Sequence, residues 1–132
     1  KNTSFVDSAG LSYLNRSTAY EAAKLAKAAF ENEDVSKAVL SEEYSFTTAG
    51  NRKKTIYTTD SLLKSFPTNG IKLSGGKTGY TGAAGYCFVG KFNNKDNQEI
   101  FVVILGGEDH DYRFQKTKEL AQWTYDNFAW KY

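Results

Sequence analysis

The chain has 132 residues, of which 40% are apolar, and its 17 basic and 15 acidic side chains give a formal net charge of +2. This composition excludes a disordered chain, and no apolar run is long enough to cross a membrane. The length allows at most one domain with a real core. The basic residues are scattered apart from the run Arg52-Lys53-Lys54, which we interpret as a solvated turn, so we expect no nucleic-acid partner.

Cysteine and histidine each occur once, as Cys87 and His110. No disulfide can form within the chain, and we expect Cys87 to be a small buried residue of an apolar strand. We expect His110 to be structural or solvated, because its neighbours Asp109 and Asp111 would point away from it on a helix. In the absence of an HExxH or CxxC pattern, we expect no metal and no other cofactor.

Residues 1–15 carry turn signals, and we expect irregular structure there. A helix is predicted from Thr18, because Thr18 and Glu21 have the spacing of a capping box. The small apolar residues that follow recur at helical intervals, namely Ala19, Ala22, Ala23, Ala26, Ala29 and Phe30. Asn32-Glu33-Asp34 ends this helix and can cap a short second helix that runs to about Leu40.

Two groups of strands follow. Residues 42–48 and 53–59 alternate as two antiparallel strands around the turn Ala49-Gly50-Asn51. A short apolar segment, Ser61-Leu62-Leu63, then precedes a loop that contains Pro67 and Asn69-Gly70. Three more strands are predicted at about 72–80, 84–92 and 98–106, and a polar connection joins the last two.

Gly106-Gly107 ends the last strand, and Asp109 or Asp111 can cap a final helix that runs to about Phe128. The predicted inner face of this helix consists of Phe114, Thr117, Leu120, Ala121, Thr124, Tyr125 and Phe128. Helices, a strand pair, three strands and a helix, in this order, indicate an α+β fold in which helices pack on an antiparallel sheet.

The stretch Gly75–Gly82 holds four of the eleven glycines and a lone lysine. Because glycine gives a strand no side chain to pack, such a cluster suggests close approach of a ligand, although a tight turn between hairpin strands is an equally open alternative. On a strand, Lys77 and Gly79 would face one side and Thr78 the other. Lys77 supplies a positive charge, the Thr78 hydroxyl can donate to a carboxylate, and the Tyr80 amide can donate to a developing oxyanion. These groups together would bind the C-terminal end of an extended peptide by strand addition.

A longer string around this stretch, Gly76-Lys77-Thr78-Gly79-Tyr80-Thr81 followed by Ala84-Gly85-Tyr86-Cys87, resembles the serine D-alanyl-D-alanine carboxypeptidases, which are low-molecular-mass penicillin-binding proteins. The similarity extends over essentially the whole chain, through Asn2-Thr3-x-Phe5, Gly10-Leu11, Ser17-Thr18-Ala19-Tyr20, Leu62-Leu63 and Gly106-Gly107. The resemblance implies a partial β-lactamase/transpeptidase-like fold and an extracytoplasmic location. The implied substrate is a peptidoglycan stem peptide that ends in D-Ala-D-Ala, which β-lactams mimic in the complete enzyme.

The same resemblance implies a role for each residue of the strand. Lys77 supports the site electrostatically and in proton transfer, and Tyr80 lends its backbone N–H to the oxyanion hole, which makes these two the candidate catalytic residues. Thr78 binds the substrate carboxylate. Gly79 and Thr81 complete the candidate substrate-binding set.

The chain departs from the family in what it lacks. The S-x-x-K and S-x-N motifs, which lie upstream in relatives, are not in their expected places. Ser61–Lys64 and Ser74–Lys77 match S-x-x-K, but we interpret both as coincidences, because the first lies in a predicted loop and residues three apart on a strand face opposite sides. We therefore expect residues 1–132 to be the C-terminal part of a catalytic domain, a processed or excised piece that is inactive alone. The alternative is a non-catalytic peptidoglycan-peptide-binding or pseudoenzyme module.

Two further expectations follow from these departures. Some relatives carry an arginine just before the leucine pair, where this chain has Thr58-Thr59-Asp60, so carboxylate recognition would fall to Thr78 with Thr81. Without the nucleophile-bearing half, apolar surface would be exposed, so we expect self-association or association with that half. The chain shows no signal-peptide or anchor pattern.

Overall fold

The computed structural model describes residues 1–65 and 70–130. Its elements, in chain order, are α1 (Ala19–Phe30), α2 (Glu33–Val39), β1 (Glu43–Thr47), β2 (Lys53–Tyr57), α3 (Leu62–Ser65), β3 (Lys72–Thr81), β4 (Gly85–Asn93), β5 (Glu99–Gly107) and α4 (Tyr112–Asn127). This order confirms the predicted α+β layout, and the ends of the strands lie within two residues of their predicted positions. The predicted loop at Pro67 and Asn69 lies outside the described residues.

Side-chain caps begin the two N-terminal helices, as predicted. The Thr18 hydroxyl accepts from the Glu21 amide at 3.2 Å, and the Asn32 side chain accepts two amides of the first turn of α2. The capping-box spacing also implies that the Glu21 carboxylate accepts the Thr18 amide, and this part of the prediction is wrong. The Glu21 carboxylate accepts instead from the Asn2 amide at 3.0 Å and the Thr3 hydroxyl at 2.6 Å, so it ties the N-terminal segment to α1.

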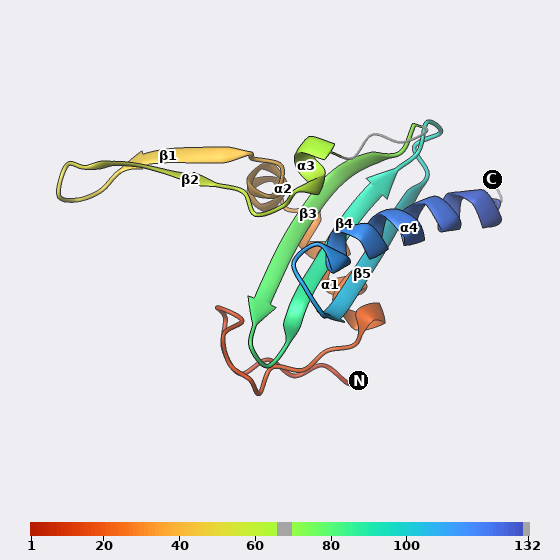
Figure 1. Ribbon diagram of the computed structural model, residues 1–132, viewed down its shortest axis with the longest axis horizontal. Coiled ribbons are helices and arrows are strands. Elements are labelled where there is room, and N and C mark those ends of the chain that lie inside the picture. The colour runs from red at the N-terminus through yellow and green to blue at the C-terminus, as the bar shows by residue number, and fades with distance from the viewer. Residues whose placement is uncertain (66–69, 131–132) are drawn as a thin grey trace.

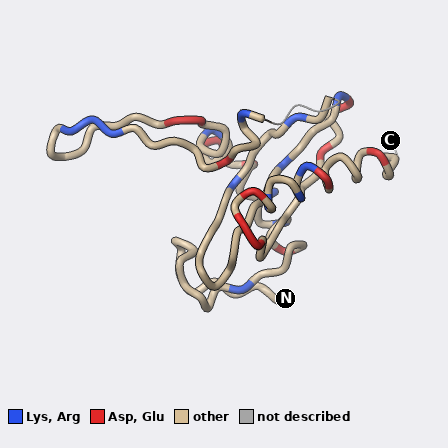
Figure 2. The backbone as a smooth tube through the Cα atoms, viewed as in Figure 1, with Lys and Arg blue, Asp and Glu red and all other residues tan. Residues whose placement is uncertain are grey.

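The described residues form two separate antiparallel sheets. β3, β4 and β5 form a three-stranded sheet in that order, with β3 at one edge, and β1 and β2 form a two-stranded hairpin that projects away from it (Figure 1). Every residue of β1 and β2 is exposed. The basic run 52–54 lies at the far end of the hairpin (Figure 2), which confirms that it is solvated.

Helices cover both faces of the three-stranded sheet. α4 packs on β4 and β5 from one side, where Phe114 meets Phe88 edge-on with ring centroids 5.5 Å apart. The buried core lies on this side and consists of Leu62, Ile71, Leu73, Phe88, Phe92, Val102, Phe114 and Ala121. α1 packs on the opposite side, where Phe30 lies 6.3 Å from Phe101 between ring centroids.

The buried face of α4 differs from the predicted one at both ends. Phe114, Thr117 and Ala121 are buried as predicted. Leu120 and Phe128 are exposed, so their predicted burial is wrong, whereas Arg113, which was predicted at no buried position, is only 3% exposed. The buried stripe of α4 therefore begins one residue earlier than predicted, at the charged residue Arg113.

The start of α4 also differs from its prediction, in the contacts of His110 with its neighbours. Asp111 occupies the N-cap position without a side-chain cap bond, while Asp109 Oδ1 accepts the amides of Asp111 and Tyr112 at 2.8 and 2.7 Å. His110 is exposed, as expected, but its Nδ1 lies 2.7 Å from Asp111 Oδ1. The prediction that these neighbours point apart is wrong, because both precede the first turn of the helix.

The Tyr125 hydroxyl joins α4 to the sheet, and its removal is a test of this packing. It lies 3.0 Å from the carbonyl oxygen of Phe92 and 2.8 Å from that of Gln98. We expect Tyr125→Phe to lower the free energy of unfolding by about 1 kcal/mol in urea titrations, the usual contribution of one hydrogen bond. Tyr20→Phe, at an exposed tyrosine of α1, is the matched control and is expected to change nothing.

The contribution of the Tyr125 hydroxyl to stability can also be tested at alkaline pH. Burial raises the pKa of Tyr125 to about 12, and the charge of Glu99 adds to the effect. Because the folded state favours the neutral phenol, its contribution to stability is lost as pH rises from about 10 through the folded-state pKa. The stability difference between the wild type and Tyr125→Phe is therefore expected to shrink over that range. A constant difference would contradict this role of the hydroxyl.

Candidate active site

The glycines of β3 lie where side chains approach the strand from both faces. A Cβ atom added at Gly75 would lie 3.0 Å from the ring of Phe30, and one added at Gly76 would lie 2.2 Å from Asp60 Oδ2. The turn into β4 comes later, between Thr81 and Gly85. The tight-turn alternative is therefore wrong for Gly75, Gly76 and Gly79, which are strand residues, and the first two are in close contact with their surroundings.

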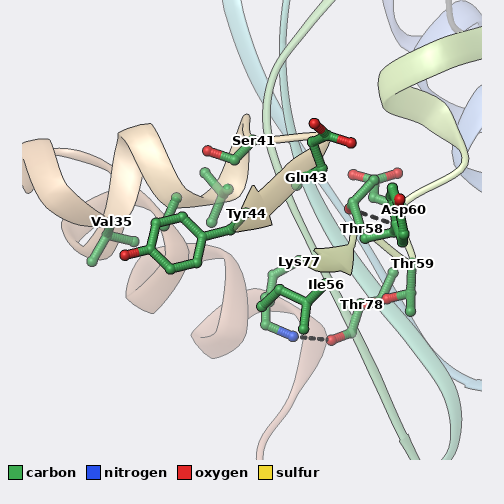
Figure 3. A pocket seen from close by; sticks show the side chains of 14 residues that line it. Val35, Ser41, Glu43, Tyr44, Ile56, Thr58, Thr59, Asp60, Lys77 and Thr78 are labelled. Carbon is green, nitrogen blue, oxygen red and sulfur yellow. Dashed lines mark hydrogen bonds between the residues drawn. The ribbon is translucent and has the colours of Figure 1, made fainter. Parts of the chain in front are cut away.

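Lys77 and Thr78 face opposite sides of β3, as predicted. They pair with Val89 and Phe88 across an unbroken antiparallel register. The Lys77 ammonium folds onto the backbone of its own strand and donates to the carbonyl oxygen of the next residue, Thr78 (Figure 3). The Thr78 hydroxyl lies 2.6 Å from that of Thr59, which stands just after the hairpin. A cation bonded to the Thr78 carbonyl and a pair of threonine hydroxyls thus occur at adjacent residues of the strand.

The backbone alternation of β3 directs the Tyr80 amide away from β4. In an antiparallel pair, the N–H and C=O of one residue point to the same edge, and alternate residues share that edge. The Thr78 carbonyl is reached by the Lys77 ammonium, so it points to the edge that β4 does not occupy. The N–H of Tyr80, two residues later, shares this orientation. In the part of the chain that the structure describes, no strand pairs with this edge.

Arg113 holds the strand from the face that α4 covers. Its NH1 group donates to the carbonyl oxygens of Gly79 at 3.1 Å and Cys87 at 3.4 Å, which are paired residues of β3 and β4. Cys87 itself is half-buried rather than buried. Arg113 was not among the predicted inner residues of α4, although its spacing of four to Thr117, and of Thr117 to Ala121, is a helical stripe that could have indicated it.

Asp60 is a second buried charge at the same face. It is only 3% exposed, and its Oδ1 accepts from the Leu62 amide at 2.9 Å. Burial raises the pKa of Asp60 above its ordinary value, while the Leu62 amide and the charge of Arg113 act in the opposite direction. Within residues 1–65 and 70–130, neither Asp60 Oδ2 nor Arg113 Nε has a hydrogen-bond partner.

A cavity of about 720 Å³ opens beside Lys77 and Thr78, between β3, α2 and the base of the hairpin (Figure 3). Its outer walls are largely apolar and include Val35, Val39, Tyr44 and Ile56. Polar groups gather where the cavity meets β3. The arrangement can therefore bind an extended chain whose charged end reaches the strand and whose remainder contacts apolar surface.

Neither S-x-x-K string forms a nucleophile and base. Ser61 and Lys64 lie at α3, a short helix where a loop was predicted, and the Lys64 ammonium lies 3.6 Å from the Glu42 carboxylate. Among the described residues, no serine hydroxyl bonds to a lysine ammonium, and no group of three His, Cys, Asp or Glu side chains could hold a metal. The same ranges include no helix that is both long and apolar enough to span a bilayer.

The raised pKa of Asp60 predicts how the free energy of unfolding changes with pH. Because its pKa is raised in the folded chain, folding favours the neutral carboxyl. The stability that this group contributes is present below its unfolded pKa of about 4 and is lost as pH rises through the folded value. We expect the free energy of unfolding of the wild type to fall over this range relative to that of Asp60→Asn. Asp96→Asn, in an exposed turn, is the control, and equal pH profiles for all three chains would contradict the prediction.

Comparison with known proteins identifies the family. Residues 1–109 match the sequence profile of the D-alanyl-D-alanine carboxypeptidase family. The chain is 31% identical over 121 residues to D-alanyl-D-alanine carboxypeptidase DacF of Bacillus subtilis, a match that covers 91% of this chain and 30% of that protein. It is 34% identical over 58 residues to DacA of Haemophilus influenzae, which covers 44% of this chain and 15% of that protein. The chain thus spans less than a third of the length of these curated relatives.

Solved structures share the fold. A mutant of a Streptomyces DD-transpeptidase superposes with a TM-score of 0.82 at 22% identity, over 96% of this chain and 49% of that chain. The D-alanyl-D-alanine carboxypeptidase of Mycobacterium tuberculosis superposes with a TM-score of 0.80 at 22% identity, over 96% and 48% of the two chains. These likenesses confirm the transpeptidase-like architecture. The profile match over residues 1–109 identifies the family: the chain belongs to the D-alanyl-D-alanine carboxypeptidase family.

Proposed function

We propose that this chain supplies the substrate-binding strand of a serine D-Ala-D-Ala carboxypeptidase, an enzyme that removes the terminal D-alanine from peptidoglycan stem peptides. One observation carries the proposal. The unpaired edge of β3 brings together the Lys77 ammonium, the Thr78 hydroxyl and the Tyr80 amide, within a family that acts on this bond. Residues 1–132 would then be the C-terminal part of the catalytic domain, with the nucleophile in sequence outside it.

Each group has a task in this reaction. The substrate lies along the edge at Gly79, and the Thr78 hydroxyl donates to its terminal carboxylate near the charge of Lys77. A serine attacks the carbonyl carbon of the penultimate residue, and the Tyr80 N–H donates to the oxyanion that forms. The C–N bond breaks, D-alanine leaves with a proton on its amine, and water then hydrolyses the acyl-enzyme. Lys77 supports the developing charge and the proton transfer.

The hydroxyl pair of Thr59 and Thr78 supports the proposed carboxylate site. Thr59 occupies the segment before the leucine pair, where some relatives carry an arginine. Its hydroxyl holds that of Thr78 in place, so the two hydroxyls and Lys77 would replace a guanidinium. The Thr81 hydroxyl accepts from the Ala84 amide at 3.1 Å and still has its own proton to donate to a substrate.

The wider setting follows from the same proposal. We place the enzyme outside the cytoplasm, where peptidoglycan lies, and expect β-lactams to acylate its serine in the complete protein. The isolated chain exposes large apolar side chains, among them Leu11, Tyr20, Leu25 and Trp123. This exposure supports association with the nucleophile-bearing half or with a second copy. A single monomeric species in light scattering would count against either association.

Binding of a peptide end is the direct test. We expect an acyl-D-Ala-D-Ala peptide to shift the amide resonances of Thr78 and Tyr80 in titrations followed by ¹H–¹⁵N NMR. The same peptide with a C-terminal amide is expected to bind about tenfold more weakly or worse, because it lacks the carboxylate that the hydroxyls anchor. Thr78→Val is expected to abolish this preference for the acid. Equal binding of acid and amide would contradict the carboxylate site.

Complementation separates the enzyme from the alternative, a non-catalytic peptide-binding module. Mixing the chain with an N-terminal fragment that carries S-x-x-K is expected to restore release of D-alanine, whereas the chain alone is expected to remain inactive. Peptide binding without recovery would favour the module. The chain alone is also expected to resist labelling by a fluorescent penicillin. Labelling at Ser61 or Ser74 would show that one of these serines is a nucleophile after all.

A further inference from the structure

We propose that Asp60 is a positioning residue for β3, whose buried carboxylate fills the space beside Gly76 and, together with Arg113, fixes the edge that presents Thr78 and the Tyr80 amide. The role of that edge rests on the proposed function, but the contacts that fix it do not. The inference assigns a function to a charged residue that touches no substrate in the mechanism above.

Asp60 is held in place through both its backbone and its side chain. Its backbone N–H donates to the Thr58 hydroxyl at 3.1 Å, and its Oδ1 accepts from the Leu62 amide at 2.9 Å. These bonds anchor the residue between the root of the hairpin and the first turn of α3. These two bonds hold both the backbone and the Oδ1 atom of Asp60 in place.

The other carboxylate oxygen occupies the space of a missing side chain. A Cβ atom at Gly76 would lie 2.2 Å from Asp60 Oδ2 and 3.0 Å from the ring of Phe88. Positions 60 and 76 thus share one volume, which the carboxylate fills. Gly79 differs, because a Cβ there would meet only the Cβ of Cys87, at an ordinary 3.7 Å.

Arg113 provides the second fixed point on the same face. Its guanidinium bonds to the carbonyl oxygen of Gly79, and its charge favours the ionised form of Asp60. One buried charge therefore contacts the strand just before Lys77, and the opposite charge contacts it just after Thr78. The segment between them is held at both ends from one face, which leaves its outer edge free for a ligand.

A double-mutant cycle tests the shared volume. We expect Gly76→Ala to lower the urea midpoint of unfolding sharply, because its methyl group overlaps the carboxylate. Asp60→Ala makes room, so the double variant is expected to recover most of that loss. The matched control combines Asp60→Ala with Gly79→Ala, whose effects are expected to add. Additive effects for positions 60 and 76 would overturn the contact on which the proposal stands.

Amide resonances and affinity test the positioning itself. Asp60→Ala is expected to move the ¹H–¹⁵N resonances of Thr78 and Tyr80 and to weaken binding of an acyl-D-Ala-D-Ala peptide by about tenfold. Asp60→Asn, which keeps the shape and the bond to Leu62, is expected to restore both. Asp96→Ala is expected to change neither. Unmoved resonances in a folded Asp60→Ala chain would overturn the proposal. If the wild type binds no peptide, the proposed function fails separately, and the resonances and the cycle still decide the role of Asp60.

Discussion

The packing of α4 on the aromatic face of the sheet is the interaction on which the remaining structure depends. Phe88 and Phe92 are almost fully buried beneath Phe114 and Ala121, and this layer contains nearly all of the core. β4 carries both aromatic residues and pairs with β3, so the edge strand is fixed only as firmly as this layer is packed. The burial of side chains between α4 and the sheet therefore determines the geometry of the outer edge of β3, although that edge contributes little buried surface itself.

The two charges beneath that edge oppose the stability of the layer. Buried ions lose their hydration, and a buried pair often contributes less than apolar residues of the same size would. A core of this size can contain Asp60 and Arg113 only because backbone amides and carbonyls satisfy part of each group. Sites in which a local rule of stability is broken are commonly those that serve function. The charges here lie against β3, whose outer edge pairs with no strand among the described residues.

Local patterns predicted most of the fold, and non-local contacts account for the errors at Glu21 and Arg113. The caps at Thr18 and Asn32 and the alternation along the strands depend on neighbouring residues, so they could be read from the sequence. The burial of Arg113 was harder to predict, because arginine is usually exposed and its partner Gly79 lies 34 positions earlier, and only the helical spacing to Thr117 and Ala121 indicates it. Spacing alone left Gly75–Gly82 open between a turn and a ligand edge. The family resemblance favoured the edge, and the register of β3 excluded the turn.

The hairpin of β1 and β2 differs from the rest of the chain in how it can open. Its strands bury no residue, and a two-stranded ribbon without a core is only marginally stable. Backbone hydrogen bonds in such a unit open by local fluctuation, well below the free energy needed to unfold the main sheet. Its root, however, leads into Thr59, whose hydroxyl contacts Thr78. The proposed carboxylate anchor therefore spans two cooperative units, and a ligand that orders it would slow amide hydrogen exchange in the hairpin while leaving exchange in β4 and β5 unchanged.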